Sequence, residues 1–251
     1  MGNQNEVRKN FGQRASEYRL SSTHGNPADL ERMINLIKPS PDASAFDVAT
    51  GGGHTAIALA KCVKQVVAID ITSEMLSEAK IASSKEGIRN ITFREEDVHN
   101  LNISDCQFDI VASRFAVHHF SDVNRALQEM CRVLKPGGKF YIHDCSVFNG
   151  EEPEKEINRI ELLRDSSHHF SYSPRLWHQL LDELPLTIDH TSLLKEQYEL
   201  PRWFDRMGTD QYSRKEIFRI LNSLSAECKA HYPFGDDYIT TYRFEILATK
   251  N

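Results

Sequence analysis

The feature that most constrains this chain is an alternation of short apolar runs and amphipathic segments between residues 45 and 146. The apolar runs are typical of buried strands, and the segments between them carry apolar residues at helical spacing. The predicted strands cover residues 45–49, 65–70, 90–94, 108–113 and 139–144. Strands that alternate with helices at this spacing form a parallel sheet with helices on both faces. We therefore predict an α/β fold with a doubly wound sheet.

The first predicted strand runs into a glycine-rich turn and then into a helix. Gly51, Gly53 and Ala56 have the spacing of the nucleotide-binding fingerprint, in which glycine lets the backbone approach a ligand closely. Taken alone, this spacing also fits an ordinary strand-to-helix turn. Asp47 is the unusual residue, because a carboxylate in a buried strand is costly unless it meets a donor or a cation. It indicates a ligand just beyond the end of the strand.

Acidic residues lie at the ends of the first three predicted strands, namely Asp47, Asp70 and Asp97. Open parallel sheets bind ligands beyond the carboxyl ends of their strands. Asp70 has close to the spacing from the glycines that is expected of a ribose-binding acid, and Asp97 would lie one strand further out, beside an adenine ring. Each acid alone could simply end a strand or cap a helix. The series of acids favours a ligand that contains adenosine.

Bulk properties exclude several classes of partner. A net charge of −6 and a pI near 6.0 argue against a nucleic-acid partner, which would need a basic face. We find no signal-peptide pattern and no apolar run that would span a bilayer, so no membrane partner is expected. The five cysteines are scattered and lack the paired spacing of metal ligands. We therefore expect a cytoplasmic protein with reduced thiols and no metal site.

We predict a single domain over residues 1–251, with a helical lid at 1–40, a core at 43–147 and an elaboration at 148–251 that builds the substrate pocket and supplies the last strands. The lid would contain helices over residues 5–20 and 28–37. Its side chains Tyr18 and His24 either face the ligand or pack against neighbouring side chains. Residues 186–200 look partly extended. Later helices are predicted over residues 154–164, 175–183 and 213–229, the last opened by a capping box at Ser213.

Together these motifs resemble class I S-adenosylmethionine-dependent methyltransferases, and the nearest group is the ubiquinone/menaquinone-biosynthesis type of small-molecule enzyme. The resemblance covers residues 43–146, and the flanks match only loosely. The motifs that carry it are Asp47-Val-Ala-Thr-Gly-Gly-Gly-His, the acid Asp70, Glu96-Asp97-Val98, Ser113-Arg-Phe-Ala-Val-His-His-Phe, and Arg132-Val-Leu-Lys-Pro-Gly-Gly.

The resemblance implies a Rossmann-like seven-stranded sheet whose last strand, about Thr240–Thr249, runs antiparallel. It also implies S-adenosylmethionine as cofactor, S-adenosylhomocysteine as product, and a small organic methyl acceptor; we expect a monomer or homodimer. Asp47 and the turn would surround the methionine part, Asp70 and Ile71 would flank the ribose and adenine, and Ser113 and Arg114 would face the acceptor. The residues that we assign to cofactor binding are Tyr18, Asp47, Ala49, Thr50, Gly51, Gly53, Asp70, Ile71, Asp97, Val98, Ser113 and Arg114.

The catalytic demand of such a reaction is modest. A sulfonium is already an activated methyl donor, so much of the acceleration comes from holding donor and acceptor in line without water. A general base is needed only if the acceptor must lose a proton. We take His118 and His119 as the catalytic candidates, with His143 and Asp144 as further possible bases. Neighbouring histidines rarely converge on a metal without other ligands.

Alternative functions explain fewer of these residues. An NAD(P)-dependent oxidoreductase shares the glycine spacing and Asp70 but leaves Asp47, Asp97 and the Lys-Pro-Gly-Gly turn unexplained. A nucleic-acid methyltransferase is disfavoured because the fourth strand leads into Ser-Arg-Phe-Ala and not into the Asn/Asp-Pro-Pro-Tyr string of amino-methylating enzymes. A non-catalytic protein that binds S-adenosylmethionine remains the other class of alternative.

Overall fold

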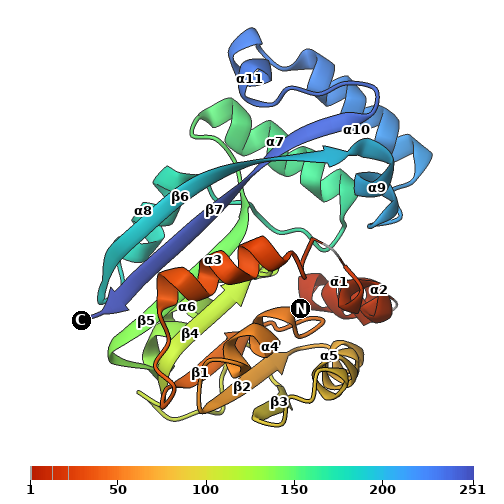
Figure 1. The fold of residues 1–251 in the computed structure, drawn as a ribbon. Coiled ribbons are helices and arrows are strands. Elements are labelled where there is room, and N and C mark those ends of the chain that lie inside the picture. Colours follow the sequence, from red (N-terminus) through yellow and green to blue (C-terminus); the bar gives the residue numbers. More distant parts are fainter. Residues whose placement is uncertain (1, 13, 22) are drawn as a thin grey trace.

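The computed structural model describes residues 2–12, 14–21 and 23–251 and is built on one seven-stranded sheet of order β3-β2-β1-β4-β5-β7-β6 (Figure 1). β7 runs antiparallel to both of its neighbours, and the other pairs are parallel. This confirms the predicted sheet and its antiparallel last strand. The strands are β1 Ser44–Val48, β2 Gln65–Asp70, β3 Ile91–Glu95, β4 Phe108–Arg114, β5 Leu134–Ser146, β6 Leu186–Glu199 and β7 Tyr238–Lys250.

Helices cover both faces of the sheet, as the alternating pattern predicts. Figure 1 shows α3 and α4 on one face, α6 on the other, and a separate group of helices at the far ends of β6 and β7. The helices are α1 Gly2–Gly12, α2 Ala15–Arg19, α3 Pro27–Ile37, α4 His54–Ala60, α5 Ser73–Lys85, α6 Val123–Val133, α7 Glu151–Arg164, α8 Pro174–Asp182, α9 Leu200–Asp205, α10 Gln211–Ser223 and α11 Ala226–His231, with a 3₁₀ turn at Val117–His119.

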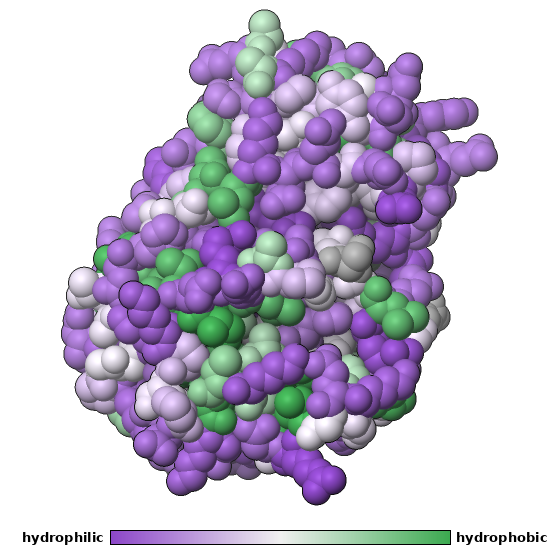
Figure 2. All heavy atoms as spheres, in the orientation of Figure 1, coloured by the Kyte–Doolittle hydropathy of each residue, from purple (hydrophilic) through white to green (hydrophobic). Residues whose placement is uncertain are grey.

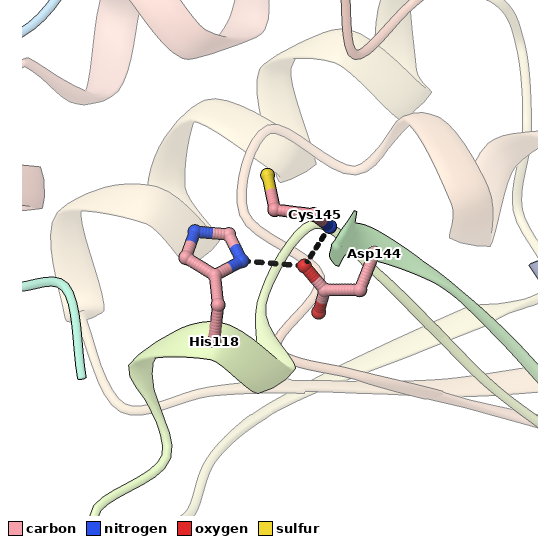
Figure 3. Close-up of side chains that lie close together, drawn as sticks. All are labelled: His118, Asp144 and Cys145. Atoms are coloured by element: carbon pink, nitrogen blue, oxygen red, sulfur yellow. Dashed lines mark hydrogen bonds and ion pairs between the residues drawn. The ribbon is translucent and has the colours of Figure 1, made fainter. Parts of the chain in front are cut away.

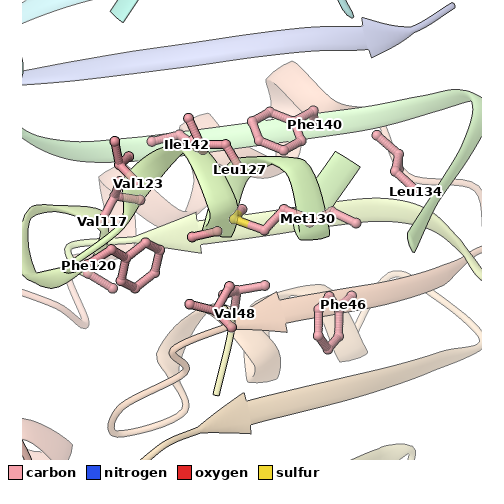
Figure 4. Close-up of a cluster of buried hydrophobic side chains, with 14 of the residues drawn as sticks. Phe46, Val48, Val117, Phe120, Val123, Leu127, Met130, Leu134, Phe140 and Ile142 are labelled. Atoms are coloured by element: carbon pink, nitrogen blue, oxygen red, sulfur yellow. The ribbon is translucent and has the colours of Figure 1, made fainter. Parts of the chain in front are cut away.

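The main core lies between the sheet and α6. The apolar stripe of α6, with Leu127 and Met130, packs onto the inward side chains of β1, β4 and β5 (Figure 4). A second cluster lies under α3 and α4 and includes Met33 and Leu59. Burial of such side chains is worth about 1.5–3 kcal/mol each and is the main force that holds helices to the sheet.

A third apolar cluster holds the elaboration together. It joins α7, α9, α10 and α11 and centres on Trp203, Ile217 and Tyr232. Ile239 and Tyr242 at the start of β7 belong to this third cluster, whereas Phe244 and Ile246 further along the same strand belong to the main core. β7 therefore contributes side chains to both cores and joins the elaboration to the sheet.

Several helix boundaries differ from the predicted ones. Instead of one helix over residues 5–20, the structure has α1 and α2 with Arg14 in a non-helical conformation before α2. The helix predicted from Ser213 to Lys229 begins earlier, because the Asp210 side chain accepts hydrogen bonds from the backbone N–H groups of Tyr212 and Ser213. It also breaks in two, since Ser225 caps a new helix by accepting from the N–H of Cys228.

A network of buried charges fixes α3 to the sheet. Asn26 caps the helix and Pro27 occupies its first turn, which places Asp29 against the sheet. Asp29 is 4 % exposed; it lies 3.0 Å from Arg243 Nη1 of β7 and 3.1 Å from Arg32 Nη1. Arg32 also pairs with Glu245 at 3.1 Å, and Glu245 accepts a hydrogen bond from Tyr141 at 2.6 Å. Charges from both ends of the chain thus neutralise one another under α3.

One face of the molecule is largely polar. Figure 2 shows a largely hydrophilic face with scattered hydrophobic groups. Within the described residues, no helix is both long and apolar enough to traverse a bilayer.

Candidate functional site

The glycine-rich turn has a backbone that requires glycine. Gly51 has φ +53°, and a Cβ there would point into open space, so this position faces a void. Gly53 has φ +88°, and a Cβ there would come 2.9 Å from the Cβ of Ala79 in α5. The turn therefore presents bare backbone to the void on one side and packs tightly on α5 on the other.

A cavity of about 940 Å³, including its mouth, lies beyond the carboxyl ends of β1, β2, β3 and β4, within the size range of small-molecule sites. The glycine turn, the strand ends, α1, α2 and the 3₁₀ turn all contribute to its lining. The structure brings most of the residues predicted from the sequence together here, namely Tyr18, Ala49, Thr50, Gly51, Asp70, Ile71, Asp97, Val98, Arg114 and His119, and His24 joins them.

The other predicted residues, Asp47, Gly53, Ser113 and His118, lie behind the cavity wall and do not line it. Asp47 is 1 % exposed and accepts a hydrogen bond from the Thr50 hydroxyl at 2.6 Å. Burial raises the pKa of Asp47 to about 7. The Ser113 hydroxyl donates to the carbonyl of Val48 at 3.1 Å and so ties β4 to β1. Asp47 and Ser113 thus support the turn and strand ends from behind.

Asp70 is the carboxylate best placed to meet a ligand. Its Oδ2 accepts from the N–H of Gly51 and its Oδ1 from the N–H of Thr72, both at 2.9 Å. Burial raises its pKa, and these backbone donors oppose that rise. An ionised carboxylate accepts hydrogen bonds at both oxygens, so Asp70 can also accept from a ligand hydroxyl in the cavity. Asp70 therefore binds the glycine turn and faces the cavity at the same time.

Asp97 lies one strand further along the same edge. Its Oδ1 accepts from the N–H of His99 at 3.0 Å and lies 2.6 Å from His99 Nδ1. His99 and Glu96 also line this end of the cavity, beside Val98. This end therefore combines an anchored carboxylate with the apolar side chain of Val98, as a heteroaromatic ring with an amino group would require.

The two adjacent histidines have opposite roles. The protonated ring of His118 donates through Nδ1 to Asp144, and Asp144 also accepts from the backbone N–H groups of Ala116 and Val117 (Figure 3). Burial opposes protonation of His118, but the Asp144 charge overcomes it and raises the pKa well above the usual value. His118, Asp144 and Cys145 offer three possible metal-ligating atoms within 4.8 Å of one another, yet the imidazole nitrogen is engaged by the carboxylate.

His119 is the member of the pair that lines the cavity. Its ring centroid lies 4.0 Å from that of His118, and its Nδ1 lies 3.0 Å from the carbonyl oxygen of Ser167. Burial and the positive charge of His118 lower the pKa of His119 to about 4. His119 is therefore neutral near pH 7, beside a histidine that is charged.

The other suggested bases do not reach the cavity. His143 is fully buried, and neither of its ring nitrogens has a hydrogen-bond partner among the described residues. Burial lowers its pKa well below the usual value. Asp144 is fully buried and committed to His118. His143 and Asp144 are therefore part of the support beneath the cavity floor.

The N-terminal helices close the cavity. The Tyr18 carbonyl oxygen lies 3.1 Å from His54 Nε2, and Arg19 pairs with Glu78 of α5 at 2.5 Å. A Cβ on Gly52 would lie 2.9 Å from the Cα of Arg19, so α2 approaches the glycine turn as closely as backbone can. On its other side, Arg14 donates to the carbonyl of Arg206 at 2.9 Å. The segment thus bridges the sheet domain and the elaboration.

Arg114 contributes a buried cation with spare donors. Its Nη1 donates to the carbonyl of His24 at 3.2 Å, and its Nη2 lies 3.9 Å from Asp29. The Nε and Nη2 atoms have no hydrogen-bond partner among the described residues, although the residue is only 6 % exposed. A buried guanidinium with unused donors at a cavity is suited to an anionic ligand group.

Sequence reasoning missed several residues that line the cavity. Phe115 follows β4 with φ +55°, an uncommon conformation for a bulky residue. Its place inside the Ser-Arg-Phe-Ala motif was a usable signal. The others are Val7, Phe11, His54, Thr55, Ile69, Thr72, Met75, Glu96, His99, Ala116 and Phe120, most of which follow or precede a predicted residue directly.

Comparison with known proteins gives a consistent result. Residues 39–208 match a family model described as a methyltransferase domain. The chain is 30 % identical to the uncharacterized methyltransferase YcgJ of Bacillus subtilis over an alignment of 221 residues. This alignment covers 87 % of each protein. It is 35 % identical over 157 residues to a demethylmenaquinone methyltransferase of Bacteroides fragilis, covering 57 % of this chain and 64 % of that one.

Solved structures agree with the sequence comparisons. The crystal structure of Bacillus subtilis YcgJ aligns with a TM-score of 0.82 at 27 % identity, covering 88 % of this chain and 97 % of that one. A candidate methyltransferase from Bacillus halodurans aligns with a TM-score of 0.85, also at 27 % identity, covering 89 % of this chain and 99 % of that one.

Proposed function

The chain belongs to the methyltransferase domain family, and we propose that it transfers the methyl group of S-adenosylmethionine to a small organic acceptor. The observation that carries this proposal is the position of Asp70. Its carboxylate lines the cavity beside the bare backbone of the glycine turn, where the two hydroxyls of a ribose could donate to it. Arg114 lines the same cavity and would pair with the carboxylate of the cofactor's amino acid part.

In this proposal the cofactor lies along the cavity lining. Asp70 and Ile71 would hold the ribose, Asp97 and Val98 the adenine, and the turn with Arg114 the amino acid part. When bound, the cofactor supplies a methyl group activated by its sulfonium. The chain's own contribution is to orient the two reactants and to exclude water by means of Phe11, Tyr18 and Phe115, which close the cavity beside His119.

His119 is the proposed proton acceptor for acceptors that must lose a proton. It lines the cavity and is neutral near pH 7, because His118 beside it carries the positive charge. Neighbouring groups whose pKa values are pushed apart are typical of acid–base sites. A neutral imidazole also avoids repelling the positive sulfonium. In this arrangement His118 and Asp144 position His119 and do not touch the reactants.

Replacing Asp70 with alanine tests the cofactor assignment. We expect the D70A variant to bind S-adenosylhomocysteine about 100-fold more weakly, because charge-assisted hydrogen bonds to the ribose are worth about 1.5–3 kcal/mol each. The dissociation constant is measured by calorimetry and the fold by circular dichroism. The exposed acid Asp182 on α8 provides the control D182A, which should bind like the wild type. An unchanged affinity in folded D70A would refute the ribose assignment.

Limited proteolysis tests the proposed lid. Arg14 and Arg19 are trypsin sites in the N-terminal segment, and Tyr18 and His24 beside them line the cavity. We expect S-adenosylhomocysteine to slow cleavage at both sites several-fold, because a bound ligand stabilises the closed segment. Cleavage at the exposed Lys155 in α7 serves as the internal control. Equal rates with and without ligand at Arg14 and Arg19 would mean that the segment is a fixed part of the fold.

Turnover separates an enzyme from a protein that only binds the cofactor. Labelled methyl transfer from S-adenosylmethionine into a mixture of small phenols, acids and amines gives the direct readout. Label that appears in an organic product, and disappears in D70A, supports the proposal. Tight binding of the cofactor without transfer of the labelled methyl group to any of these small molecules favours the non-catalytic alternative.

A further inference from the structure

A second cavity lies outside the first and shares part of its wall. It encloses about 1,050 Å³, including its mouth, between α2 and the following loop on one side and the end of β6 with α9 on the other. In Figure 1 these elements face each other where α9 lies above the N-terminal helices. Tyr18 and His24 line both cavities and so form a partition between them. The outer cavity therefore lies directly beside the inner one, with these two side chains between them.

Arg206 is the unusual residue of this outer cavity. It is partly buried, and within the described residues its guanidinium makes no hydrogen bond and no ion pair. Its charge, together with burial, lowers the pKa of His24, so Arg206 lies close to the partition. Arg202 in the same cavity differs, because it pairs with Glu199 at 3.1 Å and is largely exposed. One of the two arginines is thus left without a counter-charge.

A ladder of alternating cations and aromatic rings connects the two cavities. The guanidinium carbons of Arg206 and Arg243 lie 5.3 and 5.6 Å from the ring centroid of Tyr198. Arg243 and Arg114 in turn lie 4.7 and 4.9 Å from the ring centroid of Phe115. Each contact is within the range of a cation–π attraction. The ladder runs from the outer cavity at Arg206 to the inner cavity at Arg114.

The acids near the ladder pair with Arg243 and Arg114 and not with Arg206. Asp29 lies 3.0 Å from Arg243 but 3.9 Å from Arg114, and it also serves Arg32. Glu196 approaches Arg243 at 3.7 Å from the solvent side. Glu17 lines the outer cavity but forms no ion pair within the described residues. Among the described residues, Arg206 is thus the ladder cation that no acid pairs with, and such a guanidinium is suited to an anionic ligand group.

Resting on the proposed methyl transfer, we propose that the acceptor is a small organic oxyanion, a carboxylate or a phosphate ester, which enters through the outer cavity and pairs with Arg206. A planar guanidinium offers two parallel N–H donors to either group. The rings of Tyr18, His24 and Tyr198 beside it suit a flat, apolar body on the same molecule. Arg206 then selects acceptors by charge before they reach the methyl group.

Anion binding to the protein saturated with S-adenosylhomocysteine tests this proposal. Benzoate, phenyl phosphate and the neutral benzamide are titrated by calorimetry into wild type, R206Q and R202Q. We expect benzoate or phenyl phosphate to bind at millimolar concentration, and R206Q to weaken that binding at least tenfold. R202Q should change it less than twofold, because Arg202 is already paired with Glu199. The preferred anion tells a carboxylate from a phosphate.

Two results would overturn the proposal while the methyltransferase function stands. One is S-adenosylhomocysteine binding without binding of either anion at millimolar concentration. The other is anion binding that R206Q leaves unchanged or that benzamide equals. Failure of the wild type to bind S-adenosylhomocysteine removes the proposed function itself, and this proposal with it. The cofactor titration, done first, separates the two failures.

Discussion

An alanine in place of Asp29 is expected to lower the free energy of unfolding by about 3–5 kcal/mol. Asp29 is the shared counter-charge for Arg243 at 3.0 Å and Arg32 at 3.1 Å, and Arg114 lies 3.9 Å away. Arg243 is 4 % exposed, so without Asp29 a buried cation loses its closest acid. Removal of one partner of a buried pair costs far more than the pair itself contributes. A loss of this size is a large part of the stability of a typical domain.

Urea denaturation measures this loss directly. Glu31 on the same helix is exposed and makes no ion pair within the described residues, so E31A is the matched control and should change the stability by less than about 0.5 kcal/mol. D29N keeps the shape and one acceptor and should lie between the two. If D29A were no less stable than E31A, the arginines under α3 would have to be neutralised by other groups.

Acid is expected to destabilise the fold well above the pH at which carboxylates titrate. Burial lowers the pKa values of His143 and His168 well below the usual value, and both residues are buried. A folded-state pKa below the unfolded value means that the unfolded chain takes up the proton first. The stability is therefore complete above about pH 6.5 and is lost as the pH falls, by about 1.4 kcal/mol per pH unit for each histidine.

Other groups modify this slope. Asp47 has the opposite sign, because its pKa is raised to about 7, so its protonation favours the folded state as the pH falls from 7 and offsets one histidine. The partly buried His24, His54 and His119 have lowered pKa values and add to the loss. His118 has a raised pKa, so its contribution is complete below about pH 6.5 and is lost only at higher pH. The histidines with lowered pKa values outnumber the opposing Asp47, so the net expectation is a loss of stability between pH 7 and pH 5.

Urea midpoints at pH 7 and pH 5 check this expectation. H143L removes the buried imidazole whose nitrogens lack partners among the described residues. Between about pH 6.5 and pH 5 its free energy of unfolding should therefore fall by about 2 kcal/mol less than that of the wild type. His178 on α8 is exposed and gives the control H178L, whose urea midpoints should change with pH as those of the wild type do. Equal midpoints of the wild type at both pH values would contradict the expectation.

The sheet could be predicted from the sequence because parallel strands covered on both faces are continuous apolar runs. β2 was predicted with its observed ends, and β1, β3 and β4 to within one residue at either end. β6 was seen only as a partly extended stretch, because most of its residues are partly exposed and its pattern lacks a buried run. Helix α9 was missed, since Leu200–Asp205 is too short to show a helical period.

The cavity residues could be predicted where a motif and a strand end coincide. Asp70, Ile71, Asp97 and Val98 follow directly from predicted strands and line the cavity. Asp47 could not be placed correctly, because the direction of a side chain within a buried strand depends on contacts such as that from Thr50. The arginine ladder could not be predicted at all, since Arg243 and Asp29 are 214 residues apart in the sequence and only tertiary packing joins them.

The central position of β7 has a consequence for the order of folding during synthesis. β7 lies between β5 and β6 in the sheet, yet it is the last of the described strands to leave the ribosome. Until then β5 and β6 each expose an unpaired edge, which is the kind of surface through which chains aggregate. Asp29 is synthesised long before Arg243, so it also lacks this ion-pair partner until β7 is made. The nascent chain therefore keeps these edges unpaired until β7 has emerged from the ribosome, and the sheet can close only after that point.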